Sequence, residues 1–444
     1  MNRRTFLKTT GAAAACVCAT PAWSASKPAA PLSDDEILAE ARRRIPVQRQ
    51  ADGVISVRDG AGKPVAGARI TVEQLRHQFR FGCNFFKFAW CGDPESEGAY
   101  RQRFAALFNF CTLGFYWGGY EAQRGHPNYA YTDQAVEWTS RHGITCKGHP
   151  LVWDNAASSP RWLPDDTKEI RALSQARVRE IVGRFRGRID IWDVVNEPTH
   201  LADKVFKSKM AQMAATLGAA DYVNENLRIA RAANPDAFLL VNDYRTDPPY
   251  LEILKRQRED GKFLFNAVGI QSHMHSGVWP LAKAWEICDT YAQLGLPLHF
   301  TETTILSGSR KPGGPGWSTT TAPGEAQQAE QTARLYTALF GHPAVEAITW
   351  WDFSDRGAWQ EAPAGWVRDD MSPKPVYERM LSLVKGEWWT KTEARTDEHG
   401  NASVRAFCGR YRLTAEIPGT AAVSREVDWK REANRFDLAP KKES

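Results

Sequence analysis

The sequence lacks a strong charge of either sign. It holds 57 Lys and Arg against 52 Asp and Glu, and three of the basic residues, Arg3, Arg4 and Lys8, lie in the first 26 residues, where there is no acid. The remainder carries 54 basic and 52 acidic residues, a net charge of +2. A nearly neutral protein has no general electrostatic reason to bind nucleic acid or an anionic membrane surface, so we expect neither as a partner.

Long hydrophobic runs are also missing. Beyond the N-terminus no run reaches the roughly 20 apolar residues that a membrane helix needs, so no membrane span is predicted. An apolar share of 43% and a charged share of 25% are typical of a folded chain, long enough for one large domain with attachments or for two to three average domains. Aromatic residues are abundant, with 17 Trp and 12 Tyr, which suits either sugar binding or a large aromatic core.

Cysteine is sparse and has no metal-ligand spacing. None of the six cysteines beyond the N-terminal segment stands in the close pairs of a zinc cluster, so no metal is predicted. We expect most of them to be small buried hydrophobes, with a Cys83–Cys91 disulfide as the alternative in an oxidising compartment. The six are Cys83, Cys91, Cys111, Cys146, Cys288 and Cys408.

The N-terminus has the pattern of an export signal. Arg3 and Arg4 precede an apolar stretch from Gly11 to Ala19, and Ala22-Trp23-Ser24 offers small residues where a signal peptidase cuts. This segment, residues 1–26, resembles a twin-arginine signal, which implies a periplasmic or secreted protein. An uncleaved arm remains an alternative, as does a lipoprotein acceptor at Cys16.

Short alternating segments flank a longer central region. Residues 27–78 are predicted to hold a linker, a helix from the capping box at Ser33 to about Arg44, and a β-hairpin between 53 and 78. Residues 386–440 are predicted to form a C-terminal β module with strands at 402–407, 411–417 and 422–429. The two ends are expected to form a small β module together or side by side.

The central region alternates apolar runs with helical stretches. Eight βα units in about three hundred residues predict an α/β fold, a closed (β/α)8 TIM barrel over residues 79–385. In such barrels the polar residues at the carboxyl ends of the strands form the active site. Strands are expected to begin near residues 81, 111, 144, 189, 238, 267, 298 and 347, and helices to cover 174–185, 209–233, 281–294 and 324–340.

Two carboxylates follow predicted strands on opposite sides of this barrel. The fourth strand delivers Asn196 and Glu197, and the seventh delivers Glu302. Facing each other across the barrel mouth, two glutamates suit glycoside hydrolysis, in which one protonates the leaving oxygen and the other attacks or stabilises the sugar carbon. The alternative is that each forms a structural ion pair with a nearby Arg or Lys. This chemistry requires no cofactor.

Other strand tips carry side chains that suit a sugar. Amides and imidazoles hydrogen-bond hydroxyls, and indoles stack on sugar rings. His273, His275 and His299 could instead form a metal site, which we regard as the weaker alternative. The tip residues expected to bind substrate are His149, Trp153, Asn196, Tyr244, Gln271, His273, Trp351 and Trp359.

These tips together resemble glycoside hydrolase family 10, best known as endo-1,4-β-xylanases. The resemblance covers roughly residues 79–385, in segments 148–153, 193–197, 271–273, 301–302, 351–359 and 370–377. It implies Glu197 as the acid/base and Glu302 as the nucleophile of a retaining reaction. It also implies that His273 bonds Glu302, that Asn196 and His149 bond the sugar at the cleavage point, and that Trp351 and Trp359 wall the site.

The second strand departs from this family. Thr112, Leu113 and Tyr116 stand where the family has a Glu, an Asn and a Lys that grip sugar, while Trp117 matches and is taken as a substrate-binding residue. Several hydrogen bonds are lost by these changes, each worth about 1 kcal/mol net. The substrate is therefore xylan or another β-linked glycan or glycoconjugate.

Three points stay open at this level. The long loop at 308–323 either caps the cleft or is a mobile surface loop, and Trp388, Trp389 or Trp429 either bind sugar or pack against the barrel. The whole chain could also be a non-catalytic sugar-binding protein, since a fold does not by itself give a function. We expect a monomer whose partner is a polysaccharide or oligosaccharide, with endo or exo action undetermined.

Overall fold

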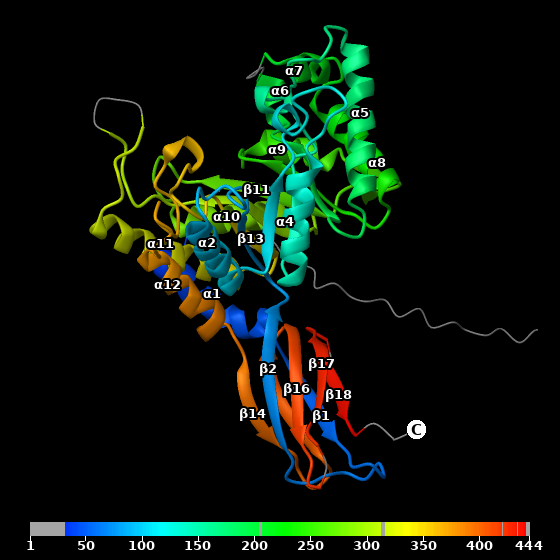
Figure 1. The fold of residues 1–444 in the computed structure, drawn as a ribbon, viewed down its shortest axis with the longest axis vertical. Coiled ribbons are helices and arrows are strands. Elements are labelled where there is room, and N and C mark those ends of the chain that lie inside the picture. Colours follow the sequence, from blue (N-terminus) through cyan, green and yellow to red (C-terminus); the bar gives the residue numbers. More distant parts are fainter. Residues whose placement is uncertain (1–31, 204–206, 312–315, 420, 433, 441–444) are drawn as a thin grey trace, which may run out of the picture. The chain divides into compact units, whose positions relative to one another are not determined.

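Eight parallel strands close into a barrel in the computed structural model, which describes residues 32–203, 207–311, 316–419, 421–432 and 434–440 (Figure 1). The predicted signal segment and the linker up to Pro31 lie outside these residues. The barrel strands are β3 (Arg80–Asn84), β4 (Phe110–Gly114), β5 (Thr145–His149), β7 (Ile191–Asn196), β8 (Phe238–Asp243), β11 (Ala267–His273), β12 (Leu298–Thr304) and β13 (Val345–Trp350).

The order of the strands follows the chain around the ring. Each strand pairs in parallel with the next, β13 pairs with β3, and the pairing of β5 with β7 closes the circle. β7 is the fourth barrel strand and β12 the seventh, so the predicted (β/α)8 barrel and its strand positions are confirmed. A short strand β6 (Val152–Trp153) runs beside the end of β7, and β9 (Arg258–Glu259) pairs with β10 (Lys262–Phe263) outside the ring.

Helices follow the strands much as the periodicity predicts. The expected helix at 209–233 is two helices, because Thr216 caps the first and Gly218, at φ 78°, starts the second. The helices are α1 (Asp34–Arg49), α2 (Pro94–Leu107), α3 (Trp117–Tyr120), α4 (Tyr129–Arg141), η1 (Ala156–Ser158), α5 (Thr167–Arg184), α6 (Thr199–Asp203), α7 (Lys209–Ala215), α8 (Ala219–Ala233), α9 (Pro248–Lys255), α10 (Leu281–Ala292), α11 (Ala322–Gly341), η2 (Trp359–Glu361), α12 (Pro375–Ser382) and η3 (Leu383–Glu387).

Strands from both ends of the chain build one β-sandwich. One sheet has the order β15-β1-β18 and the other β14-β2-β16-β17, and a shared core that includes Ile55, Ile70 and Leu413 lies between them. Sequence analysis missed β14 and β18. The strands are β1 (Gln50–Val57), β2 (Arg69–His77), β14 (Lys391–Arg395), β15 (Asn401–Phe407), β16 (Gly409–Glu416), β17 (Val423–Trp429) and β18 (Asn434–Leu438).

The predicted β-hairpin between residues 53 and 78 is wrong. β1 pairs with β15 and β18, whereas β2 pairs with β14 and β16, so the two runs lie in different sheets. Only an isolated bridge between Arg58 and Pro64 joins the segments next to the turn. Alternation reports which faces are buried but not which strand is the neighbour, and here the C-terminal strands supply the partners.

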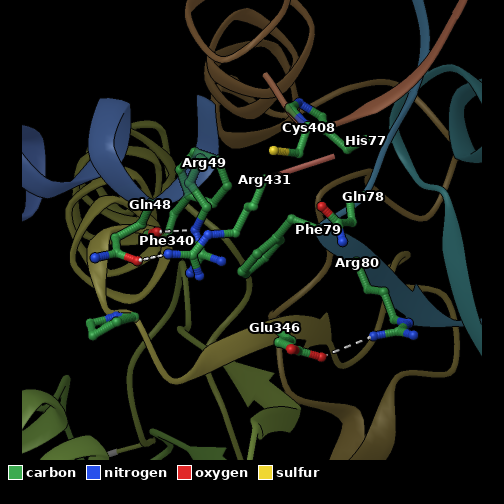
Figure 2. Close-up of a pocket in the computed structure, with 11 residues that line it drawn as sticks. Gln48, Arg49, His77, Gln78, Phe79, Arg80, Phe340, Glu346, Cys408 and Arg431 are labelled. Atoms are coloured by element: carbon green, nitrogen blue, oxygen red, sulfur yellow. Dashed lines mark hydrogen bonds and ion pairs between the residues drawn. The ribbon is translucent and has the colours of Figure 1, made fainter. Parts of the chain in front are cut away.

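The sandwich meets the barrel at the end opposite the strand tips. Arg49, at the end of α1, donates hydrogen bonds to the carbonyl oxygens of Phe340 (2.7 Å), His342 (2.8 Å) and Val345 (2.7 Å). Figure 2 shows Arg49 beside the ring of Phe340, in a small cavity of about 160 Å³ that Arg80 and Glu346 also line. Since Arg80 and Glu346 belong to the first residues of β3 and β13, this cavity is remote from the strand tips.

The capping box that predicts α1 is present. Ser33 Oγ accepts from the Glu36 backbone N–H, and the Glu36 carboxylate accepts from the Ser33 N–H at 2.8 Å. The helix runs on to Arg49, beyond the expected end, and packs on α11, where Gly341 lies against Ala41. Tertiary packing therefore extends α1 past the point where its sequence pattern ends.

The cysteines and the C-terminal tryptophans are packing residues. All six described cysteines are buried and free, so the Cys83–Cys91 disulfide alternative is not found. Trp388 and Trp429 are buried in the two cores, and Trp389 packs edge-on to His77 at 5.3 Å. Within the described residues, none of the helices is long and apolar enough to cross a membrane.

Candidate active site

A cleft of about 830 Å³ opens at the carboxyl ends of the barrel strands. Glu197 and Glu302 both line it, from the tips of β7 and β12. Ten of the eleven residues predicted for the site line this one cleft, which shows that the strand-tip rule placed them correctly. The ten are Glu197, Glu302, His149, Trp153, Asn196, Tyr244, Gln271, His273, Trp351 and Trp359.

Glu197 is buried and held by hydrogen bonds. Its Oε1 accepts from Gln271 Nε2 at 2.9 Å, and its Oε2 accepts from the Trp153 indole N–H at 2.9 Å. Burial, assisted by the negative charges of Glu302 and Asp243, raises the pKa of Glu197 to about 7. The residue also has φ 53°, a left-handed backbone that is strained for a glutamate and that functional sites often retain.

Glu302 lies in the opposite electrostatic environment. Burial alone would raise its pKa, but the charges of His149 and His273 and the hydrogen bond from His273 outweigh burial, so the pKa of Glu302 is lowered from 4.5. His273 Nε2 lies 3.1 Å from Glu302 Oε2, and His149 Nε2 lies 3.7 Å from Oε1. Among the described residues, no Lys or Arg forms an ion pair with Glu302 or with Glu197, so neither is a structural ion pair.

Three amides connect the two carboxylates. Asn242 Nδ2 donates to Glu302 Oε1 at 2.8 Å and to Asn196 Oδ1 at 2.7 Å. Gln271 Nε2 reaches the same Asn196 oxygen at 3.2 Å while donating to Glu197. The chain of hydrogen bonds fixes the position of each carboxylate relative to the other, which catalysis by two groups requires.

A buried ion pair lies beneath the cleft. Lys147 Nζ and Asp193 Oδ2 are 2.5 Å apart, and both side chains are fully buried. His149 Nδ1 lies 2.8 Å from the same carboxylate oxygen, so Asp193 orients the imidazole whose Nε2 faces Glu302. Burial opposes the ionised form of Asp193, but the Lys147 and His149 charges keep its pKa below 3.8.

A second buried histidine lies beside the other glutamate. His200 Nδ1 is 3.1 Å from Glu197 Oε2 and 3.6 Å from Asp154 Oδ1. Burial would lower the pKa of His200, but the nearby carboxylates of Asp154 and Glu197 raise it. His200 stands three residues after Glu197, in α6. Sequence analysis did not select it, because a histidine after a strand tip is not distinctive by itself.

Aromatic rings form the walls of the cleft. The Tyr116 ring lies 5.5 Å from His149 and 5.9 Å from Trp153, and Trp351 lies 5.5 Å from His149. Burial and then the charges of Glu302 and Glu197 raise the pKa of Tyr116, which shows that its phenol lies near both carboxylates. Tyr116 therefore occupies the cleft, while Thr112 and Leu113 are buried in the barrel.

Trp117 is the one predicted site residue that the structure places elsewhere. Only 2% of its surface is exposed, its indole N–H donates to Glu121 at 2.8 Å, and its ring packs against Trp162. It lines a separate hollow between α3 and α5, since the short helix that starts at Trp117 turns its side chain away from Tyr116. The structure therefore does not bring Trp117 into the cleft with the other predicted residues.

The cleft also contains residues that sequence analysis did not select. Lys87 and Phe86 come from the loop after β3, and Trp279 comes from the loop after β11. They lie beyond the last strand residue, where the strand pattern gives no guide. The others are Asn155, Ala157, Asp352 and Gly357, together with Tyr116.

The three histidines of the metal alternative do not converge. His273 and His275 are neighbours at 5.7 Å, but His299 is buried inside the barrel against Phe238, at 5.6 Å, and near Phe110. In the described part of the loop at 308–323, Trp317 is 9% exposed and packs edge-on to His275 at 5.3 Å. The His275 ring also lies 5.1 Å from Trp359, which brings this part of the loop to the rim of the cleft.

Comparison with curated proteins gives relatives of two kinds. Anti-sigma-I factor RsgI6 of Acetivibrio thermocellus is 27% identical over 88% of this chain and 48% of its own length. Endo-1,4-beta-xylanase B of Thermotoga neapolitana is 27% identical over 71% of this chain and 91% of its own length. The chain spans about half the length of the first curated relatives that it matches.

Solved structures share the barrel. Xylanase 10B from Thermotoga petrophila RKU-1, in complex with xylobiose, matches with a TM-score of 0.58 and 23% identity over 70% of this chain and 95% of that chain. Residues 1–20 match the twin-arginine translocation pathway signal sequence, so the predicted export signal is confirmed. The model of glycosyl hydrolase family 10 matches residues 81–383, about two thirds of the sequence and the whole barrel. The chain belongs to glycosyl hydrolase family 10.

Proposed function

We propose that the protein is a retaining glycoside hydrolase that cleaves a β-linked polysaccharide, with xylan as the first candidate. One observation carries the proposal: a single cleft holds two carboxyl groups whose pKa values are moved in opposite directions, Glu197 up to about 7 and Glu302 down from 4.5. Such a pair supplies a protonated acid and an ionised nucleophile at the same pH.

The first step forms a glycosyl-enzyme. A Glu302 oxygen attacks the anomeric carbon while the bond to the leaving oxygen breaks, and that oxygen takes the proton of Glu197. His149 and His273 keep Glu302 ionised before the attack. His200, whose raised pKa favours its charged form, stabilises the Glu197 carboxylate that the proton transfer leaves behind.

The second step releases the sugar. Glu197, now ionised, takes a proton from water, and the water oxygen attacks the anomeric carbon from the side of the departed group. The ester bond to Glu302 breaks, and the carboxylate returns to its starting state. Two displacements at the same carbon retain its configuration.

The other cleft residues suit a chain of sugars. Asn196 and His149 offer polar atoms next to Glu302, and the rings of Tyr244, Trp351 and Trp359 offer faces on which pyranose rings can stack. The names of several relatives, endo-1,4-beta-xylanases among them, favour xylan. Tyr116, in the place of a cation, favours the alternative of a different β-linked glycan or glycoconjugate.

Two variants and a product analysis test the mechanism. Glu302→Gln is expected to lower kcat on xylan and on an aryl β-xyloside by at least a thousandfold, because it removes the nucleophile at constant volume. Glu378→Gln, at an exposed glutamate of α12, is the matched control and should keep wild-type rates. Proton NMR of the first product should show the β-anomer, and an α-anomer would contradict retention.

A substrate panel separates xylan from the alternative. Turnover of unsubstituted xylan at least as fast as that of β-glucan, β-mannan and aryl glycosides would support xylan. Strong activity on another β-glycan with little on xylan would show that the changed residues after the second strand accompany a different substrate specificity.

A non-catalytic carbohydrate-binding protein is the second candidate. It is favoured by the relative that matches 88% of this chain and is named as an anti-sigma factor, a name that states no hydrolase activity. Binding of xylo-oligosaccharides with no turnover of any member of the panel would support this candidate and defeat the hydrolase.

A further inference from the structure

The loop between β3 and α2, residues 85–93, borders the cleft on the side of the first barrel strand. β3 stands across the ring from β8, the fifth barrel strand, which carries Tyr244 after its tip. The loop places Lys87 in the cleft lining together with Asp352 and Gly357, which follow β13. Lys87, after β3, and Tyr244, after β8, therefore line opposite sides of the cleft.

Lys87 has the character of a ligand-binding cation. Its side chain is half-buried, and its Nζ lies so close to Gly357 that a Cβ there would approach it to 2.7 Å. In the part of the chain that the structure describes, Lys87 has no carboxylate within ion-pair distance of 4.0 Å. The buried carboxylate of Asp352 nevertheless feels its charge, so donor and acceptor lie near each other.

Trp90, three residues further on, is held outward by an ordered loop. The Trp90 N–H donates to the Lys87 carbonyl at 2.8 Å, and Glu97 of α2 accepts from the Ala89 N–H at 2.8 Å. Arg356, next to Gly357, donates to the Cys91 carbonyl. These bonds fix the backbone on both sides of Trp90, yet 70% of the Trp90 side chain remains exposed.

Two strongly exposed aromatic side chains line the cleft, and a third belongs to the loop that borders it. Of the three large aromatic residues that are strongly exposed in the described chain, Tyr244 (44%) and Trp359 (45%) line the cleft, and Trp90 is the third and most exposed. An indole that water surrounds loses the stabilisation that burial would give it. Because the loop of Trp90 also supplies Lys87 to the cleft lining, the face of a pyranose ring is a suitable partner for this indole.

We propose that the β3–α2 loop forms an outer sugar subsite of this cleft, in which Lys87 donates to the hydroxyls of a sugar adjacent to the reacting one and Trp90 stacks on the ring beyond it. The proposal rests on the proposed function of the cleft. The occupant is a neutral sugar of the same β-linked chain, because the cleft lining consists mainly of aromatic rings and amides, and Lys87 can donate to hydroxyls as well as to a carboxylate.

Binding to an inactive enzyme tests the subsite without turnover. In a Glu302→Gln background, xylobiose, xylotetraose and xylohexaose are titrated calorimetrically into the parent, into Lys87→Met and into Trp90→Ala. Trp90→Ala should weaken xylohexaose binding roughly tenfold and xylobiose binding less than twofold, because only the longer chain reaches Trp90. Lys87→Met should weaken the binding of all three sugars, because a disaccharide already reaches the sugar adjacent to the reacting one. Val47→Ala and Lys391→Met, at exposed positions far along the chain from the loop, are the matched controls and should change none of these affinities.

The result distinguishes this inference from the proposed function. Unchanged xylohexaose affinity in both loop variants, or equal losses for all three sugars in Trp90→Ala, would overturn the subsite even if wild-type enzyme cleaves xylan. Tighter binding of uronic-acid-substituted oligosaccharides that is lost in Lys87→Met would show an acidic sugar instead of a neutral one. Wild-type enzyme that binds but cleaves nothing would defeat the hydrolase and leave the loop variants as the test of the subsite.

Discussion

At the scale of single residues, two glutamates in one cleft acquire different chemistry from their neighbours. Glu197 receives hydrogen bonds from an indole and an amide, and burial outweighs the charge of the neighbouring His200, so its pKa rises. Glu302 has two imidazoles next to it, and Lys147 adds positive charge from beneath the cleft, so its pKa falls. Environment, rather than residue type, therefore separates the two pKa values, as the proposed roles of acid and nucleophile require.

The first prediction concerns the pH dependence of the reaction. The proposed mechanism requires Glu197 protonated and Glu302 ionised, so kcat/KM for an aryl β-xyloside should fall tenfold per pH unit above about pH 7 and hold on the acid side down to below pH 4.5. Glu197→Gln, assayed on a dinitrophenyl glycoside whose leaving group needs no proton, should lose the alkaline limb. An alkaline limb that persists in this variant would assign it to another group.

The second prediction concerns the buried ion pair. Lys147→Met should lower the free energy of unfolding by about 3–5 kcal/mol, because Asp193 would be left buried without its cation. Urea denaturation measures the loss. The double variant Lys147→Met/Asp193→Asn removes the unpaired buried charge and should recover part of the lost free energy of unfolding. A Lys147→Met variant whose free energy of unfolding stays within about 1 kcal/mol of wild type would contradict the argument.

Sequence analysis found the residues that stand on strand tips and missed those that do not. Glu197 and Glu302 were predictable because an apolar strand ends just before each. Trp117 was expected in the cleft but lies outside it. It follows the strand tip by three residues, where a helix begins, so the direction of the strand no longer predicts where its side chain points. Lys87 and His200 were missed for the same reason, since a loop positions Lys87 and helix α6 positions His200.

At the scale of elements, close packing of two helices depends on one glycine. A Cβ on Gly341 of α11 would lie 2.6 Å from the Cα and Cβ of Ala41 in α1, which is far inside contact distance. Backbone atoms cannot move aside as a flexible side chain can, so α1 would have to shift. The helix that leads into β1 is therefore positioned by the last turn of α11.

The third prediction uses this contact. Gly341→Ala should destabilise the protein by about 1–3 kcal/mol, measured by thermal or urea unfolding. Gly183→Ala in α5 is the matched control, because no atom lies within 4 Å of its Cβ position, and it should stabilise by up to about 1 kcal/mol. Equal effects of the two changes on the free energy of unfolding would show that α1 and α11 can move apart at this contact without loss of stability.

Elements were better predicted than their partners. All eight barrel strands and their order were predictable, because parallel strands joined by helices neighbour each other in sequence order. The β-hairpin failed because β1 and β2 find their neighbours more than three hundred residues away, as in the pairing of Ala51 with Ala406. No local pattern carries that information.

At the scale of the whole molecule, the sandwich unites the two ends of the chain. β1 lies between β15 and β18, and β2 between β14 and β16, so neither N-terminal strand has a neighbour until the C-terminal strands exist. The sandwich can therefore complete only after the whole barrel has been synthesised. This order suits a chain with a twin-arginine signal, which resembles those of proteins that fold before export, and the six free cysteines need no oxidant for that folding.

The fourth prediction follows from this arrangement. A chain that ends at Trp389 should be largely insoluble, because Ile55 and Val57 of β1 and Ile70 and Val72 of β2 would lose the sheets that bury them. Co-expression of residues 390–444 as a separate chain should restore soluble, active protein, as judged by size-exclusion chromatography and xylan hydrolysis. The same fragment with Leu413→Asp, a charge in the shared core, should fail to restore it. Soluble truncated protein with full activity would instead make the sandwich an independent attachment to a barrel that folds alone.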